Sequence, residues 1–178
     1  KIEEMENEKG QKFQKILLVG IPNEVVELYK RILKGAGLKV QALELESLAF
    51  IRALTQSFQK TQGAVDNRPM LSVDIGALST NVVVSEGGAM RYSGQSNHGG
   101  LYLTHALQES LGISMTRAEN LKRRRGLLGK EGELELSTLL LTFLDVIIEE
   151  VRKIKDVYES RFAKKVEQAV LTGGGANL

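Results

Sequence analysis

Residues 71–84, Leu-Ser-Val-Asp-Ile-Gly-Ala-Leu-Ser-Thr-Asn-Val-Val-Val, predict two strands joined by a tight turn. The first strand delivers an acid, Asp74, and Gly76 lets the backbone approach a ligand closely. Ser79 and Thr80 open the second strand, so this hairpin can offer backbone N–H groups and hydroxyls to a phosphate. Asp74 has the wrong charge for a bare phosphate, but it suits a Mg²⁺ that retains waters between them. An ordinary hairpin is an equally good interpretation of this segment alone.

Strands and helices alternate on both sides of the hairpin. Apolar segments at 15–20 and 38–45 predict strands that flank a helix over residues 23–34, which is a βαβ-type pattern. The other elements predicted from apolar spacing and turn residues are helices at 47–58, 101–111, 114–126 and 134–161 and strands at 89–92 and 167–172. This alternation indicates an α/β protein.

A polar loop at 61–69 is the predicted domain boundary. We expect residues 1–60 to form a small βαβ subdomain with its following helix. Residues 70–178 are expected to form a second lobe, with a helical insertion over about 99–161.

The long helix predicted from Leu134 to Arg161 carries one apolar stripe. Its members recur every three or four residues: Leu140, Leu144, Ile147, Val151, Ile154 and Tyr158. Such a stripe suits a coiled-coil partner surface or a helix packed on a sheet, and we favour the packed helix.

Composition excludes several classes of function. The 178 residues include 24 Lys+Arg and 22 Asp+Glu, and this near balance argues against a nucleic-acid binder. There is no cysteine, which excludes disulfide scaffolds and thiolate metal sites. No apolar run approaches the roughly 20 residues of a membrane span, so direct membrane insertion is not expected.

Three further segments are candidates for binding. Three glycines, Gly173, Gly174 and Gly175, follow the last strand and expose backbone on which a base or ribose can pack. Glu119 and Lys122 share one helical face, where they form either a surface ion pair or hydrogen-bonding groups for a nucleoside. The basic run 122–125 is interpreted as a solvated helix end.

The ordered set of motifs resembles the actin-like ATPase superfamily, which has a ribonuclease H-like fold. Within this superfamily, the residues are similar in order and spacing to those of the PilM family. Members of that family are the cytoplasmic actin-like proteins of type IV pilus assembly and are related to the division protein FtsA. The segments that carry this resemblance are Val73–Ala77, Gly99-Gly100 with Leu103-Thr104, Ala118–Lys122, Leu171–Ala176 and the earlier Ala36–Ala49.

The resemblance implies a role for each matching residue. Asp74, Gly76, Ser79 and Thr80 match the second phosphate-binding loop, with Asp74 acting on Mg²⁺. The paired glycines, Gly99 and Gly100, open the helix that follows this loop and are likewise expected to bind the nucleotide. Glu119 and Lys122 match residues near the nucleoside, and Gly173, Gly174 and Gly175 match the adenosine loop.

Glu46 matches the acid that positions the attacking water in related ATPases. A carboxylate at the end of a strand can orient water for attack on a γ-phosphate. The alternative is a helix N-terminal acid that the helix dipole favours. The superfamily's proline after this acid is Ser47 here, and the two interpretations of Glu46 stay open.

The implied function is a cytoplasmic scaffold of the type IV pilus that binds ATP and Mg²⁺ and switches conformation with nucleotide. Its implied partner is the cytoplasmic N-terminal tail of a PilN-like inner-membrane protein, which would hold it at the membrane periphery. The alternatives are an active ATPase and an FtsA-like filament that self-associates. The chain starts at Lys1 and stops after a glycine turn, so we expect a piece of a longer protein that alone lacks a complete active site.

Overall fold

The computed structural model describes residues 3–6, 10–63, 67–126 and 134–178. The chain divides into two compact units, Lys1–Ala49 and Phe50–Leu178. The predicted linker at 61–69 lies partly outside the described residues. The division into domains 1–60 and 70–178 therefore stays a prediction.

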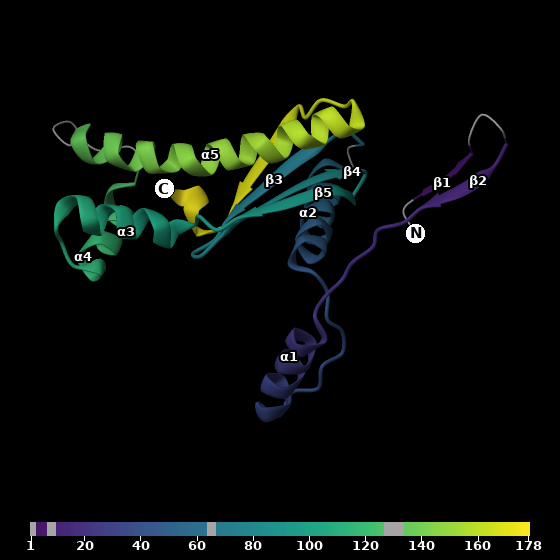
Figure 1. Ribbon diagram of the computed structural model, residues 1–178, viewed down its shortest axis with the longest axis horizontal. Helices are drawn as coiled ribbons and strands as arrows, with labels where there is room; N and C mark the ends of the chain where they lie inside the picture. Colours follow the sequence, from purple (N-terminus) through teal and green to yellow (C-terminus); the bar gives the residue numbers. More distant parts are fainter. Residues whose placement is uncertain (1–2, 7–9, 64–66, 127–133) are drawn as a thin grey trace. The chain divides into compact units, whose positions relative to one another are not determined.

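The larger unit contains a four-stranded sheet (Figure 1). Its strands are β3 (Met70–Ile75), β4 (Thr80–Glu86), β5 (Ala89–Ser96) and β6 (Gln168–Thr172), in the spatial order β5-β4-β3-β6. The first three form an antiparallel meander, and β6 joins the free edge of β3 in parallel. The four predicted strands of this region are confirmed.

Helices precede, separate and follow the strands of this sheet along the chain. They are α2 (Glu46–Gln62), α3 (Gly100–Leu111), α4 (Met115–Arg125), α5 (Leu134–Phe162) and the short 3₁₀ helix η1 (Gly174–Asn177). All four predicted long helices of the region are present. The N-cap of α4 is Ser114, whose hydroxyl accepts a hydrogen bond from Arg117 N.

Helix α5 joins two hydrophobic cores. Towards its C-terminal end, Tyr158, Val151 and Ile154 pack on the sheet, against a cluster that includes Val73 and Val82. Nearer its start, Leu140 packs with residues of α3 and α4: Leu103, Leu107 and Ala118. The apolar stripe of α5 is therefore core, as expected from its spacing, and it fixes α3 and α4 relative to the sheet.

The smaller unit differs from its predicted βαβ pattern. The helix α1 (Asn23–Gly35) is present, and β1 (Glu3–Glu6) pairs with β2 (Lys12–Lys15). The strands predicted at 15–20 and 38–45 are wrong, because residues 16–22 and 36–45 are irregular. A strand needs a hydrogen-bonded neighbour, and the described residues of this unit supply none to either segment.

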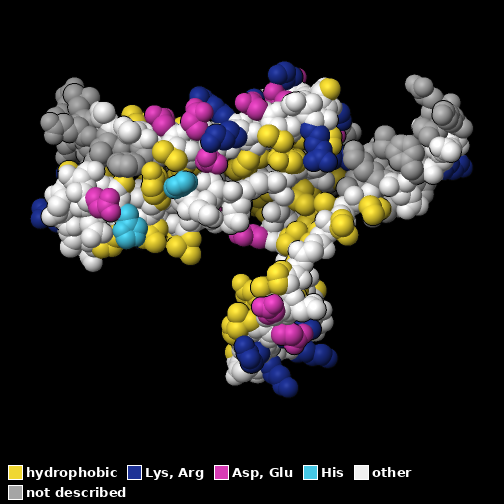
Figure 2. All heavy atoms as spheres, viewed as in Figure 1, with side chains coloured by type: hydrophobic (Ala, Val, Ile, Leu, Met, Phe, Trp, Pro, Cys, Tyr) yellow, Lys and Arg dark blue, Asp and Glu magenta, His cyan; other side chains and the backbone are white. Residues whose placement is uncertain are grey.

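Helix α1 buries none of its residues despite its amphipathic sequence. Val25, Leu28, Tyr29 and Ile32 are all more than 40% exposed. Hydrophobic side chains of this unit consequently reach its surface beside its lysines (Figure 2).

The β3–β4 turn is fastened directly to the start of α3. Gly76 O accepts from Gly100 N at 2.8 Å, and Ala77 O accepts from Leu101 N at 2.8 Å. A Cβ on Gly99 would lie 2.7 Å from Gly76 O and from Ser79 N, so only glycine fits between turn and helix. The close approach explains Gly99 without any ligand.

We expect Gly99→Ala to lower the free energy of unfolding by about 1–3 kcal/mol, because overpacking against backbone cannot be relieved by a rotamer change. Urea denaturation of the full-length protein measures this loss. Gly174→Ala is the matched control, since a Cβ there meets nothing within 4 Å. Equal stability of the two variants would contradict the packing argument.

Candidate functional site

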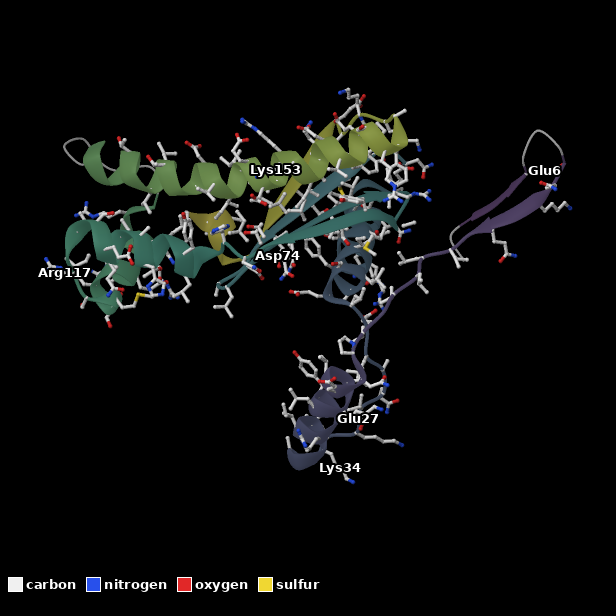
Figure 3. All side chains as sticks on the ribbon, in the orientation of Figure 1. Glu6, Glu27, Lys34, Asp74, Arg117 and Lys153 are labelled. Atoms are coloured by element: carbon white, nitrogen blue, oxygen red, sulfur yellow. The ribbon has the colours of Figure 1, made fainter. Side chains whose placement is uncertain are left out.

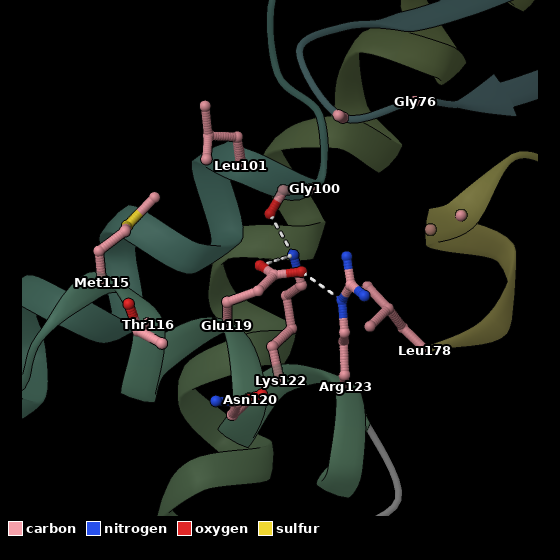
Figure 4. Close-up of a pocket in the computed structure, with 13 residues that line it drawn as sticks. Gly76, Gly100, Leu101, Met115, Thr116, Glu119, Asn120, Lys122, Arg123 and Leu178 are labelled. Carbon is pink, nitrogen blue, oxygen red and sulfur yellow. Dashed lines mark hydrogen bonds and ion pairs between the residues drawn. The ribbon is translucent and has the colours of Figure 1, made fainter.

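The larger unit has an open pocket of about 840 Å³ beside the start of α3 (Figure 4). Four elements contribute its walls: the β3–β4 turn, the first turn of α3, helix α4 and η1. The lining residues are Gly76, Ala77, Gly100, Leu101, Met115, Thr116, Glu119, Asn120, Lys122, Arg123, Gly174, Gly175 and Leu178.

A buried ammonium group organises one wall of this pocket. Lys122 is only 6% exposed, and its Nζ donates to Gly100 O at 2.7 Å, Thr104 Oγ1 at 2.8 Å and Glu119 Oε2 at 2.7 Å. These three bonds use all the protons that an ammonium group carries. They tie α4 to the first turn of α3, and a charge buried this deeply needs such partners.

Glu119 is held on both of its oxygens. Thr104 Oγ1 lies 2.5 Å from Oε2, and Arg123 Nε donates to Oε1 at 2.6 Å. Burial alone would raise the pKa of Glu119, but the hydrogen bonds from Lys122, Thr104 and Arg123 outweigh it and lower the pKa to about 2. The carboxylate is therefore ionised at neutral pH and acts only as an acceptor.

Asp74 lies at the end of the sheet nearest α3 (Figure 3). The end of β6 is beside it, and Thr172 Oγ1 donates to Asp74 Oδ1 at 3.1 Å. Gly173, at φ +82°, follows directly, and a Cβ there would lie 2.6 Å from the same oxygen. Within the described ranges no three His, Cys, Asp or Glu side chains gather around a metal position.

The structure brings together six of the predicted site residues. Those lining the pocket are Gly76, Gly100, Glu119, Lys122, Gly174 and Gly175. Asp74, Ser79, Thr80, Gly99 and Gly173 lie outside its lining. Glu46 is the first residue of α2 and belongs to the smaller unit, so its role stays a prediction.

Thr80 has a structural bond that the sequence did not indicate. Its side chain is fully buried, and Oγ1 donates to His98 O at 2.7 Å. The proton of this hydroxyl is therefore committed to the loop before α3, and a contact of Thr80 with phosphate stays a prediction. Ser79 is half-buried in the turn beside Gly99.

The three glycines after β6 divide into two kinds. A Cβ on Gly173 or Gly175 would collide with Ile75, at 2.4 Å from its O and 2.3 Å from its Cγ2 respectively. Close packing of η1 on β3 therefore requires both. Exposed backbone, the property predicted for all three, is found at Gly173 and Gly174, whereas Gly175 is half-buried. Of the three, Gly174 is the one at which an added Cβ would meet nothing within 4 Å.

The Glu119–Lys122 pair is not the surface ion pair that its spacing suggested. Lys122 is the buried member of the basic run 122–125. The other three residues, 123–125, are exposed and form the solvated helix end that was predicted for the whole run. The sequence did not indicate that Thr104 and Arg123 contact Glu119, Thr104 from outside the pocket lining and Arg123 from within it. Spacing carries a signal for Thr104, because it lies one helical turn after Gly100.

Solved structures identify the class of this fold. The chain matches a PilM–PilN type IV pilus biogenesis complex with 24% identity and a TM-score of 0.70, covering 86% of this chain and 42% of that one. It matches MreB5 of Spiroplasma citri bound to AMPPNP with 17% identity and a TM-score of 0.67, covering 89% of this chain and 55% of that one. It matches the archaeal actin homolog Ta0583 with 19% identity and a TM-score of 0.54, covering 76% of this chain and 44% of that one. The fold is a partial actin-like fold.

The family follows from the sequence itself. The family model described as type IV pilus assembly protein PilM matches residues 2–178, so the chain belongs to this family. The chain spans about half the length of the solved structures that it matches. Among the described helices, none combines the length and apolar character needed to cross a bilayer.

Because the pKa of Glu119 is lowered, the free energy of unfolding depends on pH in the acidic range. A carboxylate whose pKa falls from 4.5 to about 2 on folding contributes stability above pH 4.5, and this contribution is lost as the pH falls through about 2. We expect Glu119→Gln to flatten the fall in unfolding free energy between pH 4.5 and 2. Urea midpoints measured across this range, with exposed Glu109→Gln as the control, test the expectation. Wild-type steepness in Glu119→Gln would refute it.

Proposed function

We propose that this chain supplies one side of an ATP site in a cytoplasmic scaffold of type IV pilus assembly. The observation that carries the proposal is the pocket, in which the β3–β4 turn, an ionised carboxylate and an open glycine meet on an actin-like fold. The bound nucleotide is proposed to change how the scaffold holds its partner.

The lining residues suit the parts of a nucleotide. Glu119 Oε1 is an acceptor for a ribose hydroxyl, and the apolar side chains of Leu101, Met115 and Leu178 in the lining suit a base. Gly174 leaves backbone uncovered at the same wall. The turn at Gly76 borders the pocket where phosphates would follow the ribose.

Asp74 is the residue that would hold Mg²⁺. Magnesium keeps several waters and usually takes one or two carboxylates together with substrate phosphates, so a single carboxylate beside the turn fits this ion. When bound, Mg²⁺ would neutralise phosphate charge. Asp74 would then orient the ion's waters, while its bond from Thr172 fixes the carboxylate.

Hydrolysis is not part of the proposal. Glu46 opens α2, where the helix dipole favours a carboxylate irrespective of catalysis. An active ATPase, with Glu46 orienting water, is the alternative. Loss of turnover in Glu46→Gln with ATP binding retained would support that alternative.

The proposed partner is the short cytoplasmic tail of a PilN-like inner-membrane protein. Support comes from family membership and from the likeness to the solved PilM–PilN complex. Such a partner would place the scaffold at the membrane periphery. Self-association into FtsA-like filaments is the competing mode of assembly.

Calorimetric titration of the full-length protein with Mg·ATP tests the nucleotide site. We expect micromolar binding that Asp74→Asn weakens at least about tenfold in Mg²⁺, because one ligand charge on the ion is lost. With EDTA present, the variant should bind ATP at least as tightly as wild type, because the carboxylate that repels a bare phosphate is gone. Exposed Asp145→Asn is the control, and absence of binding by wild type would sink the proposal.

The same titration extends to the partner. A synthetic peptide of the PilN-like tail should bind with an affinity that differs between the Mg·ATP-loaded and nucleotide-free protein. Equal affinity in both states would contradict the nucleotide switch while leaving the nucleotide site itself standing.

A further inference from the structure

Thr104 is a buried hydroxyl residue that lies outside the pocket lining but contacts its polar wall. The side chain is fully buried on α3. Its Oγ1 accepts from Lys122 Nζ at 2.8 Å and lies 2.5 Å from Glu119 Oε2 and 3.0 Å from Gly100 O. A hydroxyl has one proton, so it donates to one of these two oxygens while it accepts from the ammonium.

The two oxygens of Glu119 are thereby made unequal. Oε2 accepts a hydrogen bond from Lys122 Nζ and contacts Thr104 Oγ1, and both of these residues are buried. Among the residues that the structure describes, Oε1 is paired with Arg123 alone, and the Arg123 side chain is 75% exposed. Since exposed ion pairs contribute little, a ligand hydroxyl can displace Arg123 from Oε1 far more easily than it can enter at Oε2.

Lys122 has no proton to spare for a ligand. Its three bonds go to Gly100, Thr104 and Glu119, and it is reached by little solvent. Its influence on a bound molecule therefore passes through Glu119. The pocket close-up shows Lys122 lying behind the Glu119 carboxylate and reaching towards Gly100 (Figure 4).

We infer that Thr104 is a positioning residue that, together with Lys122, holds Glu119 Oε2 and thereby presents Oε1 to a ligand hydroxyl. Selectivity for a hydroxyl-bearing nucleoside then depends on Thr104, although Thr104 does not touch the ligand. This inference rests on the proposed nucleotide site and names the feature of the nucleotide that the site distinguishes. A site built to accept a hydrogen bond rejects an analogue that lacks the donor.

Calorimetry with two nucleotides on the full-length protein tests the inference. Wild type should bind Mg·ATP more tightly than Mg·2′,3′-dideoxy-ATP, which lacks both ribose hydroxyls. Thr104→Val keeps the shape of the side chain but removes its hydroxyl, and it should weaken ATP binding about tenfold. Its affinity for the dideoxy nucleotide should stay within about twofold of wild type, and Thr104→Ser should restore the preference.

A purely structural defect would weaken both nucleotides equally, and an unchanged preference in Thr104→Val would likewise overturn the inference. A serine variant that behaves like valine would also overturn it. If wild type binds neither nucleotide, the proposed function fails and the inference with it, whereas binding of both with equal affinity refutes the inference alone. Should Thr104→Val not fold, Thr104→Ala is the second variant, checked by thermal melting.

Discussion

The buried ammonium of Lys122 is the interaction on which the arrangement of the pocket depends. A cation at 6% exposure must be surrounded by acceptors, and the chain supplies a carbonyl, a hydroxyl and a carboxylate from two helices. These acceptors can converge only if α4 lies against the first turn of α3. The first turn of α3 is also hydrogen-bonded to the β3–β4 turn. The need to surround the Lys122 charge therefore helps to fix the position of α4 relative to the end of the sheet.

The larger unit could be predicted from the sequence because its signals are local. Alternating residues of β3 and β4 face one core, and the stripe of α5 repeats every three or four residues, so period alone assigns them. The two strands predicted in the smaller unit were wrong for the opposite reason, because their formation depends on contacts that are not local. The segments 15–20 and 38–45 have strand-like composition, but a strand also requires a neighbour, and pairing is a property of the fold rather than of the segment.

The candidate site was predictable as a set of positions but not as a set of bonds. Motif order assigned Gly76, Gly100 and Glu119 to one candidate site, and all three line the same pocket, while their role there stays a prediction. Spacing could not tell that Lys122 is buried, that Thr80 is committed to His98 O, or that Gly173 and Gly175 are required for packing on Ile75. Each of these depends on contacts between segments far apart in the sequence.

Nuclear magnetic resonance of lysine ammonium groups can show whether Lys122 is held by its three acceptors. With ¹⁵N-lysine in the full-length protein, we expect a slowly exchanging Lys122 ammonium signal at neutral pH, assigned by its absence in Lys122→Met. The protons exchange slowly because each is donated to a protein acceptor at 2.7–2.8 Å. A Lys122 ammonium that exchanges as fast as the exposed ammonium of Lys153 would contradict burial of this charge, because the group would then lie in water.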